Sequence, residues 1–271
     1  MSSIDQKTLA YVNLYGILGA LTVLCEQAPE APRILGNSGC SIGFAVKDGP
    51  QATFTFVGGR CLLREGVEDC TMKIPFSSCE RFNGMMEGTV KPIPSKGFGK
   101  LPFLLRRFKK LTDLLNAYLD PTEEQLTDPE FLRRSTVILF RVIAASAAAV
   151  ANHDPVGRFS ASNMPDGTLK LEIAGTCKAA LTVQDHALTC SPKVPKDYSA
   201  YMQFADIETA RALFDGKLNA VAAVGLGTVR IGGMIPLADN LNRLLSRAEP
   251  YLKTQKKTKK TGKKGNTEAE K

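Results

Sequence analysis

The sequence has few of the groups on which enzymes and metal proteins build their sites. Only two histidines occur, His153 and His186, and neither has a second histidine at the spacing of a metal site. No G-x-S-x-G, P-loop or C-x-x-C motif is present, so the signatures of a serine nucleophile, a phosphate-binding loop and a redox or zinc centre are missing. An enzyme is therefore the least favoured class, and we expect no catalytic residues, no metal site and no cofactor.

The cysteines show no pairing pattern. Their number is odd, at seven, and hydrophobic residues make up 44% of a chain of 271 residues. Unpaired cysteines of this kind are typical of reduced, buried thiols in a cytoplasmic protein. We therefore expect a cytoplasmic location and either one large domain or two domains of ordinary size.

The body of the chain also lacks a large excess of positive charge. The formal net charge is +8, but the segment from Lys253 to Lys271 holds eight lysines and two glutamates, which leaves only +2 for the preceding residues. A specific nucleic-acid partner is therefore not expected. A lysine-rich segment without aromatic residues cannot build a core and is predicted to be disordered. It serves either as a solubilising tail or as a weak attractor of anionic lipid or RNA.

Two long apolar stretches are present, at Leu9 to Leu24 and at Thr136 to Val150. The first has nearly the length of a signal peptide, but Asp5 cancels the charge of Lys7 before it. The second lies in mid-chain and cannot be a leader. A buried helix is the favoured interpretation of both, with a targeting segment as the alternative for the first.

Two segments of the sequence are similar to each other and indicate an internal repeat. Residues Phe76–Gly99 align without a gap with Phe204–Gly227, at an offset of 128 (204 minus 76). One shared position is the N-cap that begins a short helix, and another is the glycine that ends this helix. Two further glycines after the helix are also shared. The matched pairs are Ser78 with Asp206, Gly88 with Gly216, Gly97 with Gly225, and Gly99 with Gly227.

The repeat predicts two similar units. Each has a long apolar helix, strands joined by tight turns such as Asp48-Gly49 and Asp166-Gly167, a short capped helix, a strand and a closing amphipathic helix. The segment between them is acidic and contains proline, as is typical of a linker. We expect a first, degenerate unit at 1–119, a linker at 120–130, a second unit at 131–252 and the tail at 253–271.

The glycines of the second copy invite comparison with a nucleotide-binding loop. Gly225 and Gly227 have the first spacing of a G-x-G-x-x-G motif, but the third position is Arg230, and a helix rather than a strand is expected before them. They are better explained as turn residues that begin a last strand, from Thr228 to Ile231.

The stretch Phe204–Leu245 resembles the sterol-carrier-protein type 2 (sterol-transfer) lipid-binding family. Three motifs carry the resemblance: Asp-Gly-Lys-Leu at Asp215 to Leu218, Gly-x-Gly-x-Val-x-Ile-x-Gly at Gly225 to Gly233, and Ala-x-x-Leu-x-x-Leu-Leu at Ala238 to Leu245. It covers 156–252 well and 32–119 more loosely. The resemblance implies an α+β fold in which each tandem unit has a mostly antiparallel sheet of about five strands with helices on one face.

It further implies an apolar tunnel in the second unit, which binds or transfers a sterol, a fatty acyl chain or a quinone-like lipid without catalysis. The tunnel candidates are the residues that strand alternation or the apolar face of a helix is expected to direct toward the interior. The alternatives are a protein-interaction scaffold with solid units, an accessory module that presents a lipid to a partner enzyme and, last, an enzyme. The tunnel candidates are Leu171, Ile173, Leu181, Val183, Phe204, Phe214, Val229, Ile231, Met234, Leu241 and Leu245.

The first copy differs in two respects. Pro92, Pro94 and Pro102 occupy the region of its last strands, where proline is poorly tolerated. Its closing helix has a basic face, which is either a solvated face of a core helix or a transient contact with an anionic membrane. The basic residues are Arg106, Arg107, Lys109 and Lys110. The oligomeric state is left open.

Overall fold

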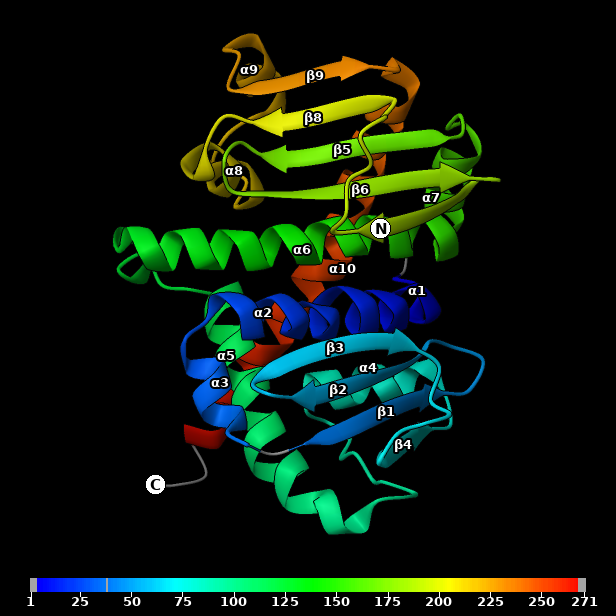
Figure 1. The fold of residues 1–271 in the computed structure, drawn as a ribbon, viewed down its shortest axis with the longest axis vertical. Coiled ribbons are helices and arrows are strands. Elements are labelled where there is room, and N and C mark those ends of the chain that lie inside the picture. The colour runs from blue at the N-terminus through cyan, green and yellow to red at the C-terminus, as the bar shows by residue number, and fades with distance from the viewer. Residues whose placement is uncertain (1–3, 38, 268–271) are drawn as a thin grey trace. The chain divides into compact units, whose positions relative to one another are not determined.

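A computed structural model describes residues 4–37 and 39–267, with side chains described as far as Lys253. The chain divides into two compact units, one of Met1–Asp120 with Ala248–Lys271 and one of Pro121–Arg247. Each unit has its own sheet and helices, and helix α10 (Ile235–Thr267) contributes residues to both units (Figure 1). The predicted α+β class is therefore confirmed.

The first unit begins with a nearly continuous helical segment that changes between α, π and 3-10 geometry. It continues with a shorter helix, four strands, a capped helix and a closing helical segment with π geometry at its start. In chain order these are α1 (Gln6–Tyr11), η1 (Val12–Ile17), η2 (Leu18–Ala20), α2 (Leu21–Gln27), α3 (Glu30–Leu35), β1 (Cys40–Val46), β2 (Gln51–Val57), β3 (Arg60–Glu65), β4 (Met72–Phe76), α4 (Cys79–Glu87), η3 (Phe98–Lys100), η4 (Phe103–Phe108) and α5 (Lys109–Leu119).

The sheet of the first unit has four strands in the order β3-β2-β1-β4, and only the β1–β4 pair is parallel. Where a fifth strand would pair with β4, the described residues form a single bridge between Lys73 and Lys96. Pro92 and Pro94 lie just before this bridge, and proline has no N–H to donate to a strand pair. This unit therefore has four strands where about five were expected, and its prolines explain the difference.

The second unit has a 3-10 turn, a long helix, a short helix, four strands, two short helices, a fifth strand and the start of the last helix. In chain order these are η5 (Gln125–Thr127), α6 (Pro129–His153), α7 (Pro155–Ser162), β5 (Gly167–Ile173), β6 (Cys177–Gln184), β7 (Ala187–Ser191), β8 (Ala200–Phe204), α8 (Ile207–Phe214), α9 (Ala220–Gly225), β9 (Val229–Gly233) and α10 (Ile235–Thr267).

The five strands of the second sheet have the order β7-β6-β5-β8-β9, and all neighbours are antiparallel except β5 and β8. This is the order of the first sheet with β9 added. The predicted capped helices occupy the same place in both units, α4 after β4 and α8 after β8. The shared strand order supports the interpretation of the chain as a tandem repeat.

The ungapped alignment is wrong beyond the capped helices. Gly97 and Gly233 have the same φ of 83°, and a Cβ on either would lie 2.2–2.3 Å from a backbone oxygen, of Thr71 and Ser199 respectively. Gly97 therefore corresponds to Gly233 and not to Gly225, which lies in α9. The first unit has no helix at that place among its described residues, so the offset grows from 128 to 136 (233 minus 97).

The two Asp-Gly turns, which were predicted to correspond between the units, lie at different places in the two sheets. Asp48-Gly49 joins β1 to β2, and Asp48 has a φ of 55°. Asp166-Gly167 instead leads into β5, and the turn between β5 and β6 contains Gly175 with a φ of 68°. Residues with positive φ mark such turns in both units, but a dipeptide motif alone does not tell which strands it connects.

The two long apolar stretches are helices. The segments 6–27 and 129–153 are long and apolar enough to cross a membrane, and 78% and 83% of their apolar windows are buried within the chain. Such burial is typical of core helices, which is the interpretation favoured by the sequence. All seven cysteines are free.

Helix α10 continues to Thr267 and so includes most of the lysine-rich segment that was expected to be disordered. A helix that is already nucleated extends at little further cost, which explains why polar residues follow it. Residues 268–271 and the side chains after Lys253 lie outside the described residues.

Candidate functional site

The second sheet has one apolar face and one polar face. On the polar face the Lys170 ammonium lies 2.8 Å from the Glu172 carboxylate, and the Gln203 amide donates to the same carboxylate at 2.9 Å. The hydrogen bond from Lys170 lowers the pKa of Glu172. The opposite face carries the apolar residues of all five strands, and the helices lie on that side (Figure 1). An apolar ligand would therefore lie between this inner face and the helices.

The tunnel candidates fall into three groups by exposure. Most of them line the inner face and are buried, Phe214 and Leu245 are half-buried, and Ile231 and Met234 are exposed. The register aligns Leu171 with Met202, and Met202 with Ile231, so this row leads from the buried centre of the sheet to its β9 edge. The buried candidates are Leu171, Ile173, Leu181, Val183, Phe204, Val229 and Leu241.

The β9 edge of the unit is unusually apolar on its surface. Of the fourteen exposed large hydrophobic side chains among the described residues, six lie within the stretch 221–235. Val221 is 81% exposed, Leu226 75% and Ile235 62%. Exposed apolar side chains that gather on a surface mark sites of ligand, membrane or protein contact, so this stretch is a candidate for such a contact. We call this set the β9 edge cluster: Val221, Val224, Leu226, Ile231, Met234 and Ile235.

The local sequence explains why the β9 edge cluster is exposed. Asn219 caps α9 by accepting hydrogen bonds from the backbone N–H groups of Val221 and Ala222, at 2.9 and 3.1 Å. In α9 only Ala223 is buried. Strand β9 pairs with β8 alone, so its other side is a sheet edge. Ile231 and Met234 were among the predicted tunnel residues, whereas the α9 residues were not, although the apolar run AVAAVG is visible in the sequence.

Two polar anchors hold the helices beside this face. In α8 the buried Arg211 forms an ion pair with Asp215 at 2.7 Å and donates to the Ser135 hydroxyl of α6, also at 2.7 Å. These bonds fix the helix that carries Phe214, whose ring centroid lies 5.4 Å from that of Phe204. One wall of the candidate site is thereby rigidly positioned.

The second anchor joins α10 to α7. Asp154 is fully buried and caps α7 by accepting from the N–H groups of Val156 and Gly157, both at 2.9 Å. The Arg247 guanidinium donates to both of its carboxylate oxygens, at 2.9 and 2.7 Å. Helical periodicity alone does not indicate this ion pair, because it joins residues far apart in the sequence.

The first unit fills the corresponding interior with aromatic rings. Phe56 lies 5.4 Å from Phe103 and 6.0 Å from Phe108, and Phe44 lies 5.8 Å from Phe54, all measured between ring centroids. The pairing registers of the two sheets place smaller side chains at three of these positions in the second unit. The matched pairs are Phe44 with Leu171, Phe54 with Leu181, and Phe56 with Val183.

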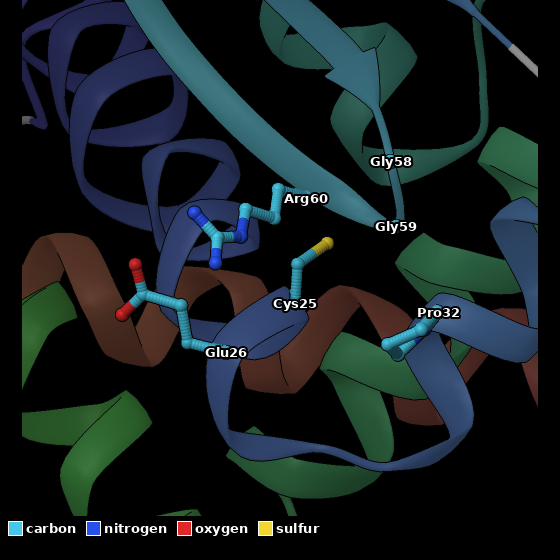
Figure 2. Close-up of a pocket in the computed structure, with 6 residues that line it drawn as sticks. All are labelled: Cys25, Glu26, Pro32, Gly58, Gly59 and Arg60. Carbon is cyan, nitrogen blue, oxygen red and sulfur yellow. The ribbon is translucent and has the colours of Figure 1, made fainter.

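Two hollows lie in the first unit, and neither is lined by a tunnel candidate. The first, of about 430 Å³, is shown in Figure 2, where the charged ends of Glu26 and Arg60 point toward one another near Cys25. Burial, together with the charge of Glu26, raises the pKa of Cys25 to about 12, so that its thiol is neutral near pH 7. This hollow has neither an apolar lining nor an activated nucleophile. Its lining residues are Cys25, Glu26, Pro32, Gly58, Gly59 and Arg60.

The second hollow, of about 460 Å³, is cationic. It is lined by Ile34 and by Arg33, Arg106, Arg107 and Lys110. Three of the four basic residues predicted to contact a membrane therefore belong to one hollow. Lys109 does not line it and pairs with Asp113 at 2.7 Å.

Groups suited to metal chemistry are not brought together. Among the described residues, no group of three or more histidine, cysteine, aspartate or glutamate side chains could hold a metal ion. His153 is the last residue of α6, and His186 lies in the β6–β7 turn with a φ of 62°.

No protein-family model matches the chain, and no curated protein matches it. Solved structures similar to it include a ubiquinone synthesis protein, UbiJ-SCP2, with 16% identity and a TM-score of 0.32 over 39% of this chain and 91% of that one. The sterol carrier protein domain 2 of Helicoverpa armigera has 18% identity and a TM-score of 0.34 over 42% of this chain and 87% of its own. Sterol carrier protein 2 like 2 from Aedes aegypti has 18% identity and a TM-score of 0.28 over 40% of this chain and 94% of its own. Sterol carrier protein domains, the family that the sequence resembles, are thus among the structures similar to this chain.

Proposed function

We propose that the second unit binds the apolar part of a lipid, without converting it, between the inner face of its sheet and the helices, and that the ligand enters at the β9 edge cluster. The ligand class is a sterol, a fatty acyl chain or a quinone-like lipid. The observation that carries the proposal is the apolar row that runs from buried Leu171 through Met202 to exposed Ile231. Such a row offers a ligand apolar contact from the surface to the interior.

A difference between the two units supports the proposal. Both sheets have the same strand order, but the second has Leu171, Leu181 and Val183 where the first has phenylalanines. Smaller side chains in the same backbone frame leave space between the sheet and the helices, unless the helices move inward. A lipid chain would fill that space in the second unit, whereas aromatic rings fill it in the first.

Burial alone supplies sufficient affinity. Removing a methylene from water stabilises the complex by about 0.8 kcal/mol, so about ten methylenes contribute about 8 kcal/mol before ordering costs. A net free energy of that size corresponds to a Kd of about 1 µM, and each further buried methylene adds about 0.8 kcal/mol that offsets the ordering costs. No proton transfer or nucleophile is required, and the raised pKa of Cys25 keeps that thiol neutral near pH 7.

The alternative is a protein-interaction scaffold. It is favoured by the position of β9, an edge strand whose free side would accept a strand from a partner, flanked by apolar side chains. In that case the second unit would bind no small apolar molecule. An accessory module that presents a bound lipid to an enzyme would combine both properties.

The test is the uptake of a fluorescent fatty acid by the purified full-length protein. Phe214→Arg places a charge on the wall of the proposed site and should abolish uptake. Arg243→Ala, which removes only an exposed ion pair with Asp239, should bind as the unchanged protein does. Thermal melting would verify that both variants are folded. Equal uptake by the two variants would refute this location of the site, and no uptake by the unchanged protein would favour the scaffold.

A further inference from the structure

The cationic hollow of the first unit is built by two separate segments. Arg33 and Ile34 come from α3, and Arg106, Arg107 and Lys110 come from η4 and the start of α5. Helices α3 and α5 lie side by side in this unit (Figure 1). Its volume of about 460 Å³ falls within the range of small-molecule sites, ~300–1,000 Å³.

The charges in the hollow are not balanced by acids. Among the described residues, no carboxylate lines it, and Arg33, Arg106 and Lys110 form no ion pair. The nearest acids along the two helices are engaged elsewhere. Tyr118 donates to Glu30 at 3.4 Å, and Lys109 pairs with Asp113.

The hollow is also preorganised. The Arg107 guanidinium is half-buried and donates to the backbone carbonyl of Leu35, at the end of α3. This bond fixes one charge at the base of the hollow and satisfies a carbonyl that the helix leaves without an internal partner. Arg106 and Arg107 lie in the π-helical segment η4, a geometry frequently found at functional sites.

Repulsion within the hollow favours an anion. Arg106 and Lys110 are four residues apart on one helical segment, where like charges destabilise each other. A bound anion removes that repulsion. Guanidinium groups match the oxygens of a phosphate in a bidentate manner, whereas a single lysine acts as a point charge.

The geometry points to a phosphate-binding site formed by Arg33, Arg106, Arg107 and Lys110. The group recognised is a phosphate monoester, carried either by a lipid headgroup or by a soluble compound. This site is independent of the proposed lipid site in the second unit, and each can fail without the other.

The test has two arms and a matched control. Inorganic phosphate binding is measured by calorimetry at low ionic strength, and vesicle binding is measured by sedimentation with phosphatidylcholine alone or with added phosphatidic acid. Arg106→Gln should weaken phosphate binding by about tenfold or more, since it removes a charged hydrogen-bonding partner. Lys109→Gln removes the same charge from the neighbouring position outside the hollow and should leave binding unchanged.

The outcomes distinguish the two sources. Loss of both phosphate and phosphatidic acid binding in Arg106→Gln alone supports a headgroup site. Loss of phosphate binding in Arg106→Gln alone, without preference for phosphatidic acid vesicles, supports a site for a soluble phosphate compound. The inference is overturned if the unchanged protein shows no saturable phosphate binding, or if both variants weaken it equally. Circular dichroism melting of each variant excludes unfolding as the cause.

Discussion

Replacing Val183 with phenylalanine tests whether the second unit has kept space that the first has filled. Val183 is buried on the inner face of β6 and pairs with Leu188 on one side and Gly167 on the other. Phe56 occupies this position in the first unit, with its ring packed against Phe103 and Phe108. The substitution therefore copies into the second unit a side chain that the same backbone frame already accommodates.

The two accounts predict different changes in the free energy of unfolding. If the interior of the second unit is open, the added ring occupies it, and the free energy of unfolding stays within about 1 kcal/mol of its original value or rises. If the interior is solidly packed, the ring must displace its neighbours, and overpacking lowers the free energy of unfolding by about 1–3 kcal/mol. In the open case the ring also removes the space for a ligand.

Two measurements on the same variant decide between these outcomes. Urea unfolding followed by far-UV circular dichroism gives the stability, and fluorescent fatty acid titration gives the binding. We expect unchanged stability together with lost binding. Thr189→Phe adds a ring on the exposed side of β7 and should change neither. A destabilised Val183→Phe that still binds the fatty acid would refute the reasoning.

Three further predictions follow from the anchors, the thiols and the tail. Asp154→Ala removes the buried carboxylate that pairs with Arg247 and should lower the free energy of unfolding by about 3–5 kcal/mol in urea titrations. As a control, Asp239→Ala breaks an exposed ion pair and should lower the free energy of unfolding by less than about 1 kcal/mol. Burial raises the pKa of Cys177 from 9.0 to about 12, so the folded state keeps a proton that the unfolded state loses, and the stability measured by urea titration should fall as the pH rises from 9.0 toward about 12. A Cys177→Ala variant should show a smaller fall than the unchanged protein, the remainder coming from other buried thiols such as Cys25. Removing residues 254–271 should leave fatty acid affinity unchanged and weaken sedimentation with anionic vesicles, and a fall in fatty acid affinity would show that the tail contributes to the site.

Local signals in the sequence predicted the local structure well. Ser78 and Asp206 cap their helices, accepting from the N–H groups of Arg81 and Thr209. Gly88 and Gly216 follow these helices with φ values of 81° and 71°. Caps and helix ends depend on a few neighbouring residues, so composition and spacing were sufficient to place them.

Features that depend on distant residues were not predicted. The alignment of Gly97 with Gly225 was wrong because the place of a glycine in a sheet depends on the strand it pairs with, and Gly97 corresponds to Gly233. The pairing of Arg247 with Asp154 joins residues 93 positions apart, and helical periodicity carries no information about it. Alternation likewise placed Ile231 on the inner face but did not show that the sheet ends at its strand.

The most direct measurement of the central claim is organic extraction of the full-length protein, purified without detergent, followed by mass spectrometry. If the second unit holds an apolar ligand between its sheet and its helices, a lipid should be recovered in an amount close to one molecule per chain, and Phe214→Arg prepared in the same way should yield none. Protein that carries no lipid, and that takes up no fatty acid when one is offered, would contradict the account.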